Sequence, residues 1–436
     1  MQKSKRIVAL LLLGGLILAL SAGFGPANAA ASAAEKQVTL TVWDFKFSDP
    51  NIHPAMVKVD QLFMKQYPNV KINHVAQPND QYYQVLRAAA QANDGPDVAL
   101  FHGARGDTYD LDEFQVKLDN YIKSWRKEIP EASWKVAATN RDFKKGIKII
   151  PLTTQGIGFY YNKAYFAKAG LDPNKPPQDW KSFLNACEKL KKAGIVPLNG
   201  GFKDYTTDFM FRTFCASIYG KNVSGLQTGK QKFAGNAAFR KAAEMMVELK
   251  SKGYFDPNGT SIPYFMDAIN MFAAGKGAIF CGLLSDIAHW KQFSDALGKD
   301  NVGYFPAINF TGAKYKDGQS LQPCGIGWGV MTWSKNKDLA EKYAECYTRG
   351  EGAAIFSNMT GALSPNTKLN VESLGYPVLK VVAGYLKKNV SEDYVTMFTG
   401  SFEDDMRAVQ QQLIVTGEIN VDKFVDQMQK VADQHR

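Results

Sequence analysis

The chain has 436 residues, of which 45% are hydrophobic, 12% aromatic and 22% charged. This composition is typical of a folded globular protein and excludes a disordered or collagen-like chain. The length allows two or three domains, each with its own core, and excludes a small scaffold held together by disulfides. Lys and Arg exceed Asp and Glu by 52 − 42 = 10, but they are spread along the chain without a run of five or six. We therefore expect no nucleic-acid partner.

The N-terminal segment over residues 1–29 has the pattern of a secretory signal peptide. Basic residues precede an apolar run over residues 7–20, and Ala27-Asn28-Ala29 offers a cleavage site. This run is shorter than the roughly 20 residues that span a bilayer. No cysteine precedes Cys187, so a lipid-modified cysteine has no position near the cleavage site. We expect an exported protein that is freely soluble and carries no lipid anchor.

The cysteines are an odd number for an exported chain, so at least one of them is free or pairs between molecules. None forms a C-x-x-C motif, and the sequence assigns no bridge. Two of them fall on the apolar faces of predicted helices and are interpreted as small buried hydrophobes. The five are Cys187, Cys215, Cys281, Cys324 and Cys346, of which Cys187 and Cys346 are these two.

The first segment of the expected mature chain alternates between the apolar period of a strand and that of a helix. The predicted elements are a strand over 38–42, a helix that starts behind Pro54 and ends before Pro68, a strand over 70–75, a helix from Tyr82 that stops at 94–96, and a strand over 97–101. Strands that alternate with helices in this way imply a parallel, doubly wound sheet.

The same alternation returns after an interruption near Pro151 and predicts a second α/β unit. Its predicted elements are a strand over 159–161, a short helix stopped by Gly170, a helix capped by Asp179 that ends at Gly194, strands over 275–280 and 302–305, a helix around 339–347, and a helical stretch over 402–434.

Motifs of the common hydrolases and cofactor enzymes do not occur. There is no G-x-S-x-G, no H-E-x-x-H, and no metal-ligand spacing among the histidines. The glycine-rich run 325–329 does not fit the dinucleotide G-x-G-x-x-G. Acidic clusters at 110–113 and 403–405 could hold a glycosidase carboxylate pair, although solvated helix faces are the commoner explanation. We expect no catalytic residue, no metal and no cofactor.

A series of short segments carries the strongest functional signal through its order and spacing. The segments are Val38 to Asp44, Phe63 to Ile72, Gly95 to Val98, Ile150 to Gly156, Tyr160 to Lys163, Ala169 to Leu171, Pro177 to Trp180, Phe272 to Ile279 and Ser334 to Tyr343. Together they resemble the extracellular solute-binding proteins of bacterial ATP-binding-cassette (ABC) importers, in the sugar-binding family that includes maltose-binding protein. The resemblance covers nearly all of residues 38–436.

The resemblance implies the α/β, two-lobed periplasmic-binding-protein fold of type II, in which each lobe is a mostly parallel sheet flanked by helices and the ligand lies in a cleft between lobes. The expected N-terminal lobe comprises residues 35–150 and 308–350, and the expected C-terminal lobe comprises 151–305 and 353–436. Crossings between the lobes are expected near Ile150-Pro151, Phe305-Pro306 and Gly350.

Sugar binding needs flat aromatic rings for the C–H face of a pyranose and polar side chains for its hydroxyl groups. Ligands of α/β sheets lie outside the carboxyl ends of the strands, and by this rule and the resemblance we select candidates in the loops that face the cleft. They are Trp43, Asp44 and Phe47 after the first strand, Phe101, His102 and Arg105 after the third, Gln155 past the first crossing, Phe202 and Asp204 in a second-lobe loop, Trp328 in the glycine-rich run, and Phe402 at the start of the last helical stretch. The run 282–285 departs from the G-x-W that relatives often carry, so a stacking platform is missing or moved.

The function that these observations predict is capture of a mono- or oligosaccharide by hinge closure, and its delivery to the membrane permease of an ABC importer. The protein is expected to be periplasmic and monomeric and not an enzyme. The alternatives are the same fold with a polyamine, peptide or metal ligand, or a secreted carbohydrate-active enzyme. Basic residues in the candidate loops, Lys46, Arg105 and Lys203, would suit an acidic sugar such as a uronate, or belong merely to a basic surface.

Overall fold

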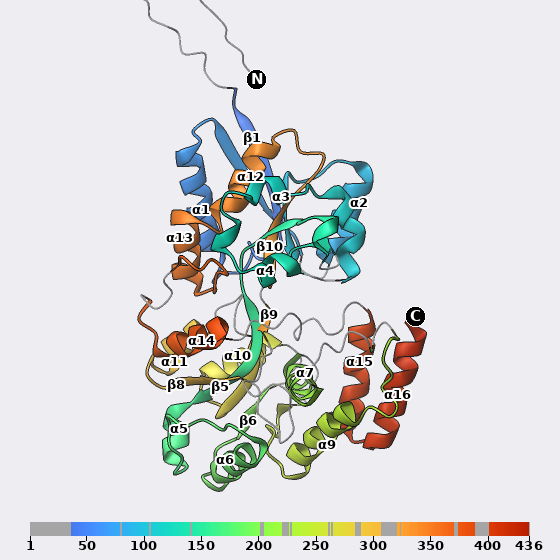
Figure 1. Ribbon diagram of the computed structural model, residues 1–436. Coiled ribbons are helices and arrows are strands. Elements are labelled where there is room, and N and C mark those ends of the chain that lie inside the picture. The colour runs from blue at the N-terminus through green and yellow to red at the C-terminus, as the bar shows by residue number, and fades with distance from the viewer. Residues whose placement is uncertain are drawn as a thin grey trace, which may run out of the picture. The chain divides into compact units, whose positions relative to one another are not determined.

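The computed structural model describes residues 36–78, 81–103, 106–139, 142–200, 205–219, 226, 229–259, 262, 265–283, 289–306, 321–322, 324–369, 374–388 and 401–435 (Figure 1). The chain divides into a unit over residues 1–36 and a unit over residues 37–436. The predicted signal peptide lies outside the described residues. Among the helices that are described, none combines the length and the apolar character that a membrane crossing requires.

A first sheet contains the strands predicted at the start of the chain. Its order is β2 (Val70–Ala76), β1 (Val38–Asp44), β3 (Val98–His102), β10 (Ile326–Val330) and β4 (Ile149–Pro151). β1 pairs in parallel with β2 and β3, whereas β10 is antiparallel to both β3 and β4. The three predicted strands are confirmed, and the sheet is parallel apart from the reversed strand β10.

Helices cover this sheet where the sequence predicts them. α1 (His53–Gln66) has Pro54 in its first turn, and α2 (Tyr82–Ala92) ends at Asn93, which adopts a left-handed conformation with φ 51°. α12 (Lys337–Cys346) is also confirmed, and α13 (Gly350–Thr360), which was not predicted, packs against α1 (Figure 1). Shorter helices α3 (Asp119–Ile122) and α4 (Glu131–Val136) and 3₁₀ turns over 106–114, 126–128 and 143–145 fill the connection to β4.

A second sheet has the order β6 (Leu198–Asn199), β7 (Ile279–Leu283), β5 (Gln155–Asn162) and β8 (Val302–Phe305), and β9 (Leu321–Gln322) also pairs with β5. β6 and β7 are parallel, and β5 is antiparallel to β7 and β8. As in the first sheet, one interior strand is reversed. The strand predicted over 275–280 begins only at Ile279, because Gly275, with φ 71°, turns the chain after the preceding helix.

The second sheet is buried on both faces. Side chains of β5 alternate between two cores: Phe159 and Tyr161 contribute to one cluster, and Tyr160 belongs to another with Phe280 and Trp290. The covering helices are α5 (Lys163–Lys168), α6 (Trp180–Lys192), α7 (Tyr205–Tyr219), α9 (Ala237–Ser251), α10 (Phe265–Ala273), α11 (His289–Leu297), α14 (Pro377–Lys388), α15 (Ser401–Gln411) and α16 (Val421–Gln434).

The predicted capping of α6 is confirmed. The Asp179 carboxylate accepts the backbone N–H of Ser182 at 2.7 Å, and the Ser182 hydroxyl accepts the backbone N–H of Asp179 at 3.1 Å, which forms a capping box. The helical stretch predicted over 402–434 is interrupted: a π turn over 412–416 and Gly417, with φ 70°, separate α15 from α16.

The chain passes between the two sheets at points that differ in part from those expected. The first passage connects β4 to β5 through residues 152–154. Residues 307–320, which follow the crossing expected near Phe305-Pro306, lie outside the described residues; β9 pairs with β5, and the next described strand, β10, belongs to the first sheet. The third passage was expected near Gly350, but Ala362 still packs in the first core and Leu363 is the first residue in a core of the second sheet.

Gly350 does not start this third passage because it turns the chain, with φ 66°, from α12 into α13, and both of these helices pack near the first sheet. The first and third passages are hydrogen bonded to each other, since the backbone N–H of Thr154 donates to the carbonyl oxygen of Leu363 at 2.6 Å. The Thr348 hydroxyl donates to the carbonyl oxygen of Pro151 at 2.8 Å. The lobe limits given above otherwise stay predictions.

The glycines of β10 allow close contact within the first sheet, and this can be tested at Gly327. A Cβ atom there would lie 2.6 Å from the carbonyl oxygen of Ile150 on the paired strand β4. We expect Gly327→Ala to lower the free energy of unfolding by about 2 kcal/mol, because the overlap is with backbone. Chemical denaturation monitored by circular dichroism measures this change.

Gly384→Ala is the matched control, because a Cβ atom at this helical glycine meets nothing within 4 Å. Alanine is the better helix former by up to about 1 kcal/mol, so this variant should be as stable as the wild type or more so. Equal stability of Gly327→Ala and the wild type would contradict the steric argument.

Candidate ligand site at the carboxyl edge of the first sheet

The carboxyl ends of β1 and β3 lie next to each other because the two strands are parallel neighbours. β1 ends at Asp44 and β3 ends at His102. The loops that follow them therefore leave the sheet at the same edge, where ligands of such sheets bind. The structure brings together the first two groups of candidates from the sequence, as far as these are described.

Two consecutive tyrosines at the start of α2 fasten this edge. The Tyr82 hydroxyl donates to the carbonyl oxygen of Trp43 at 3.1 Å and accepts the backbone N–H of Leu100 at 3.0 Å. The Tyr83 hydroxyl accepts the backbone N–H of His102 at 3.0 Å and lies 2.8 Å from its Nδ1. Both strand ends are thus tied to one helix. We did not select these tyrosines from the sequence, although a Tyr-Tyr pair at a helix start was a visible signal.

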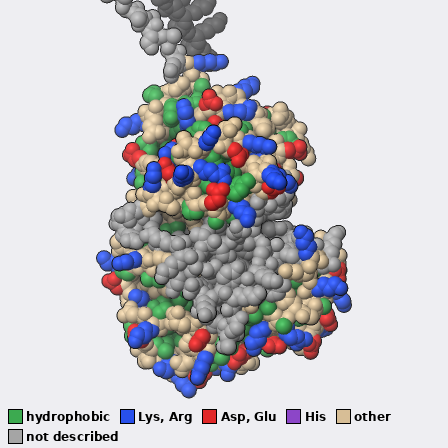
Figure 2. Space-filling model, in the orientation of Figure 1, with side chains coloured by type: hydrophobic (Ala, Val, Ile, Leu, Met, Phe, Trp, Pro, Cys, Tyr) green, Lys and Arg blue, Asp and Glu red, His purple; other side chains and the backbone are tan. Residues whose placement is uncertain are grey.

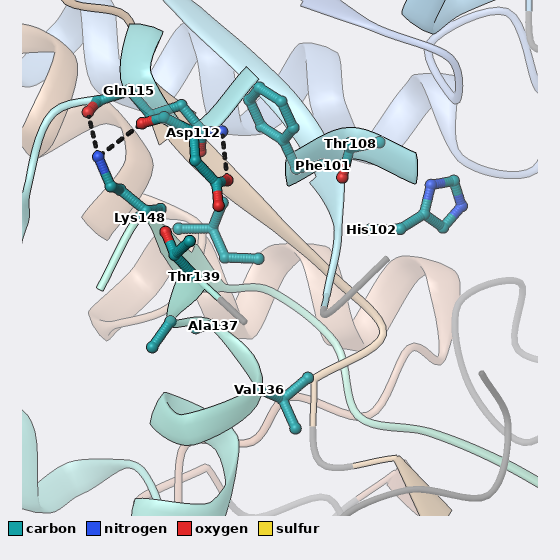
Figure 3. A pocket seen from close by; sticks show the side chains of 11 residues that line it. Phe101, His102, Thr108, Asp112, Gln115, Val136, Ala137, Thr139 and Lys148 are labelled. Carbon is teal, nitrogen blue, oxygen red and sulfur yellow. Dashed lines mark hydrogen bonds between the residues drawn. The ribbon is translucent and has the colours of Figure 1, made fainter. Parts of the chain in front are cut away.

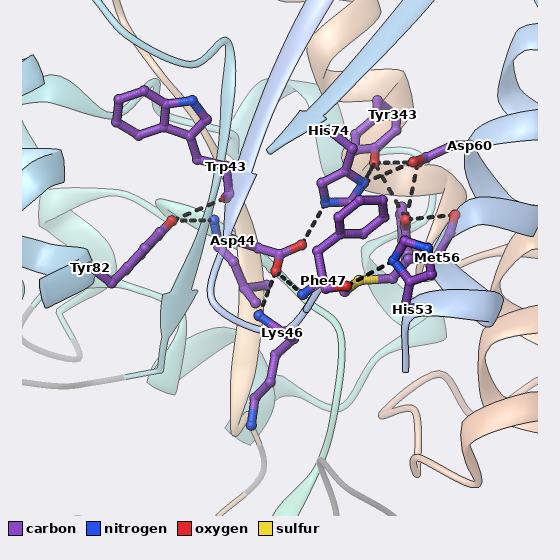
Figure 4. Close-up of polar contacts among 12 residues, drawn as sticks. Trp43, Asp44, Lys46, Phe47, His53, Met56, Asp60, His74, Tyr82 and Tyr343 are labelled. Atoms are coloured by element: carbon purple, nitrogen blue, oxygen red, sulfur yellow. Dashed lines mark hydrogen bonds and ion pairs between the residues drawn. The ribbon is translucent and has the colours of Figure 1, made fainter. Parts of the chain in front are cut away.

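The loop after β1 begins with a carboxylate that is fully buried. One oxygen of Asp44 accepts the backbone N–H groups of Lys46 and Phe47, each at 2.5 Å, and the other lies 2.5 Å from Nε2 of His74 (Figure 4). Asp44 is 0% exposed. Its polar atoms are therefore used to turn the chain and to bind His74, and in this structure it presents no oxygen to a ligand.

His74 lies between two carboxylates, a feature that was not identified from the sequence. Its Nδ1 is 2.8 Å from Oδ2 of Asp60, while Oδ1 of Asp60 accepts the Tyr343 hydroxyl at 2.6 Å (Figure 4). Burial opposes a charge on the imidazole, but the hydrogen bonds to Asp44 and Asp60 outweigh it and raise the pKa of His74 to about 9. At neutral pH the imidazole is protonated and donates to both carboxylates.

Aromatic rings surround this edge. The Phe45 ring stacks on the His102 ring with centroids 4.7 Å apart, and the Phe47 ring stacks on His74 with centroids 3.9 Å apart. Trp43 and Phe47 are both partly exposed. Of the rings that the sequence nominated after β1, these two retain surface that a ligand could contact.

Gln155 lies beside the same edge. A Cβ atom on Gly325 would lie 2.7 Å from the Cβ atom of Gln155, and the carbonyl oxygen of Gly325 accepts the backbone N–H of Gly103 at 2.9 Å. The first residue of β5 is therefore close to the turn that follows His102. That Gln155 contributes to the same site stays a prediction.

A small polar cavity lies beneath Phe101 and His102 (Figure 3). Nζ of Lys148 donates to the carbonyl oxygens of Asp112 and Gln115 at 2.6 and 2.8 Å. Burial raises the pKa of Asp112 and lowers that of Lys148. The cavity volume of about 20 Å³ suits one water molecule, so it is too small for a sugar ring.

Three predicted stacking residues are placed in cores. Phe101 is 2% exposed and packs against the glycine face of β10, where a Cβ atom on Gly329 would lie 2.9 Å from its ring. Trp328 points to the opposite face of the first sheet, where the centroid of its ring lies 5.2 Å from that of the Tyr347 ring. Phe402 belongs to a core of the second sheet. A ring without exposed faces cannot stack on a sugar, so the structure corrects these expectations to core packing.

The remaining candidates, Arg105, Phe202 and Asp204, lie outside the described residues. All five cysteines are described, and each is a free thiol. Within the described ranges, no three His, Cys, Asp or Glu side chains are grouped in a way that could hold a metal ion.

Comparison with known proteins identifies similar sequences. The family model for bacterial extracellular solute-binding proteins matches residues 48–354. The sn-glycerol-3-phosphate-binding periplasmic protein of Brucella abortus is 30% identical over 251 residues, which are 56% of this chain and 51% of the relative. An uncharacterized ABC transporter extracellular-binding protein of Pyrococcus horikoshii is 27% identical over 272 residues, 58% of this chain and 61% of the relative. The chain thus spans about half the length of the first of these relatives.

Solved structures share the fold at low sequence identity. A chitin oligosaccharide binding protein superposes with a TM-score of 0.76 at 20% identity and covers 92% of this chain and 99% of its own. The maltose-bound protein MalE3 of T. maritima superposes with a TM-score of 0.71 at 15% identity and covers 91% and 99%. These similarities establish the predicted two-lobed, type II binding-protein fold.

The charge on His74 predicts a particular pH dependence of stability. Its pKa rises from 6.5 to about 9 on folding, so its contribution is complete below pH 6.5 and disappears as the pH rises through 9. We expect His74→Gln to lower the free energy of unfolding by roughly 3 kcal/mol near pH 6 and by much less at pH 10. Urea denaturation of both proteins from pH 6 to 10 measures this difference.

His435→Gln is the control. His435 also pairs with a carboxylate, that of Asp405, at 2.7 Å, but both side chains are more exposed than those of His74 and Asp44. Its effect should stay below about 1 kcal/mol, as is typical of exposed ion pairs. A His74→Gln effect that is constant from pH 6 to 10 would disprove the charge-based explanation.

Proposed function

Since the chain belongs to the bacterial extracellular solute-binding proteins, we propose that it is exported and captures a carbohydrate, mono- or oligosaccharide, for an ABC importer. The observation that carries the proposal is the family match over residues 48–354, which includes strands of both sheets. Members of the family are binding proteins, which argues against an enzymatic role.

The site proposed for the carbohydrate is the carboxyl edge of the first sheet. Trp43 and Phe47 offer partly exposed rings for the apolar face of a sugar. The partly exposed His102 and the largely buried Gln155, which is 9% exposed, are proposed to supply polar atoms for hydroxyl groups. Arg105, Phe202 and Asp204 stay in the proposal on the strength of the sequence alone. The buried Asp44 holds the loop after β1 in place, whereas Phe101, Trp328 and Phe402 pack in cores and are left out of the proposed site.

Capture is proposed to proceed by hinge closure. The passages at 152–154 and 362–363 are hydrogen bonded to each other, so a rotation of the lobes would bend both together. A ligand that contacts both lobes only in the closed state shifts the population toward that state. The permease of the importer would recognise this closed form, which we propose to be a periplasmic monomer without a lipid anchor.

A second candidate ligand is a phosphorylated polyol. It is favoured by the relatives named for sn-glycerol 3-phosphate. Such a ligand needs cationic groups for its phosphate. Lys46 follows the buried Asp44, and its Nζ lies 5.6 Å from the centroid of the Phe45 ring, close to the proposed site. Among the described residues on the face shown in Figure 2, Lys and Arg side chains are interspersed with Asp and Glu and form no single basic patch.

Thermal unfolding with a ligand panel tests the proposal. The panel contains neutral mono- and oligosaccharides, a uronate, sn-glycerol 3-phosphate and a polyamine. A ligand at 100 times its dissociation constant stabilises the folded state by about 2.7 kcal/mol, so one sugar should raise the melting temperature clearly. Response to the polyamine alone, or to no compound, would refute carbohydrate capture. Turnover of an oligosaccharide in the same samples would indicate an enzyme instead.

Gln155→Ala tests the site with the ligand found in this way. We expect its dissociation constant to rise about tenfold to a hundredfold, because a buried hydrogen bond to the ligand is lost. Gln61→Ala, on the exposed side of α1, is the matched control and should bind as the wild type does. Isothermal titration calorimetry measures both, and unchanged binding by Gln155→Ala would exclude Gln155 from the site.

A further inference from the structure

We propose that His74 is the positioning residue of the ligand loop, which we define as residues 45–48. The inference rests on the proposed function, because that function makes this loop part of the site. His74 itself lies on the edge strand β2, and its side chain is 3% exposed. It therefore acts on the ligand only through the groups that it holds.

The first of these groups is the carboxylate of Asp44. One of its oxygens binds the backbone N–H groups of Lys46 and Phe47 and so determines the path of the ligand loop. The other oxygen binds Nε2 of His74 at 2.5 Å. Without this donor a buried carboxylate oxygen would lose its partner, which is costly inside a protein. The carboxylate would then turn toward water and release the loop.

The second group is the ring of Phe47. It lies parallel to the imidazole of His74, with an interplanar angle of 14° and a centroid distance of 3.9 Å. His53 packs on the same ring at 4.4 Å, and its Nδ1 lies 2.8 Å from the carbonyl oxygen of Phe47. A protonated imidazole on the face of a phenyl ring is a favourable cation–π contact. His74 thus fixes both the backbone and the side chain of Phe47.

The surroundings of His74 are arranged for a protonated ring. Asp44 faces it from β1 and Asp60 from α1. The hydroxyl of Tyr343 in α12 and that of Tyr347, directly after α12, donate to Asp60 at 2.6 and 3.2 Å, so this carboxylate keeps its orientation toward His74. Burial raises the pKa of both tyrosines well above the ordinary value, which keeps them donors over the whole accessible range.

Two further groups complete the environment. The Trp328 ring of β10 presents an edge to His74 with centroids 6.1 Å apart. The Cys346 thiol, which interacts with Asp60, has its pKa raised to about 12 by burial and stays neutral. Among these neighbours, only the two carboxylates can match the charge of the imidazolium. An uncharged core residue at position 74 would leave them facing each other, with the cost of like charges in a buried site.

Hydrogen exchange followed by mass spectrometry tests the inference without a ligand. We compare His74→Gln with the wild type and with the control His435→Gln at pH 7. In His74→Gln the amides of residues 44–50 should exchange at least about tenfold faster, while those of β3 keep their protection, because the loop opens locally. Asp60→Asn, which keeps the imidazole, should show a smaller increase and serves if His74→Gln fails to fold.

Unchanged exchange at 44–50 would overturn the inference. A uniform increase over the first sheet would also overturn it, because His74 would then be a general core residue. The same variants are titrated with the sugar identified above at pH 7 and pH 10. We expect affinity about tenfold lower for His74→Gln at pH 7, and a wild-type affinity that falls toward the same value at pH 10 as the imidazole loses its proton.

Local opening without a loss of affinity would sever the link between His74 and the ligand and so reject its positioning role. If the wild type binds no member of the panel, the proposed function fails, and the exchange comparison alone decides whether His74 holds the loop. The two failures are therefore distinguishable.

Discussion

The two oxygens of the buried Asp44 carboxylate connect the end of β1 to the loop that follows it and to the neighbouring strand β2. One oxygen accepts the backbone N–H of Phe47 and so turns the chain as it leaves β1, and the other accepts a hydrogen bond from His74 on β2. The imidazole continues the connection to Asp60 on α1 and, through it, to the tyrosines of α12. The edge where the ligand loop begins is thus held by charge-assisted hydrogen bonds in a buried setting, where such bonds are strong and where any missing partner is expensive.

A second constraint is the close approach of strands around β10. This strand is reversed relative to its neighbours and carries glycine at alternate positions, so the paired strand β4 and the ring of Phe101 can pack directly against its backbone. The alternate face of the same strand contributes Trp328 to the core beside α12. The close contact of Gly325 with Gln155 also brings the start of β5 to the edge of the first sheet. β10 and the glycine before it therefore connect the core of the first sheet with residues 152–154, where the chain first passes to the second sheet.

Much of the fold was predictable because the signals are local. The period of apolar residues located β1, β2, β3 and β8 and the helices α1, α2, α6 and α12, and Pro54 and Asp179 marked helix starts. Helices α7, α9, α10 and α11 were not identified. α7 is buried on nearly every side, so it lacks a polar face and its period is hard to recognise. α9 has the helical period of buried apolar residues, so its sequence carried a signal that was missed. The third passage was placed too early because a glycine turn between two helices resembles a crossing in sequence.

For the candidate site, too, local signals were predictable from the sequence and tertiary packing was not. By itself the sequence determined the family, the alternation of strands and helices, and the strand ends at which ligand groups are to be sought, because each of these depends on neighbours along the chain. The tertiary structure decided which of the nominated aromatic residues stay partly exposed, Trp43 and Phe47 but not Trp328 or Phe402, since burial depends on what packs from elsewhere. It also revealed His74, an isolated histidine in the sequence, as the centre of a charged network, because its two carboxylate partners lie 30 and 14 residues away and meet it only in the folded sheet.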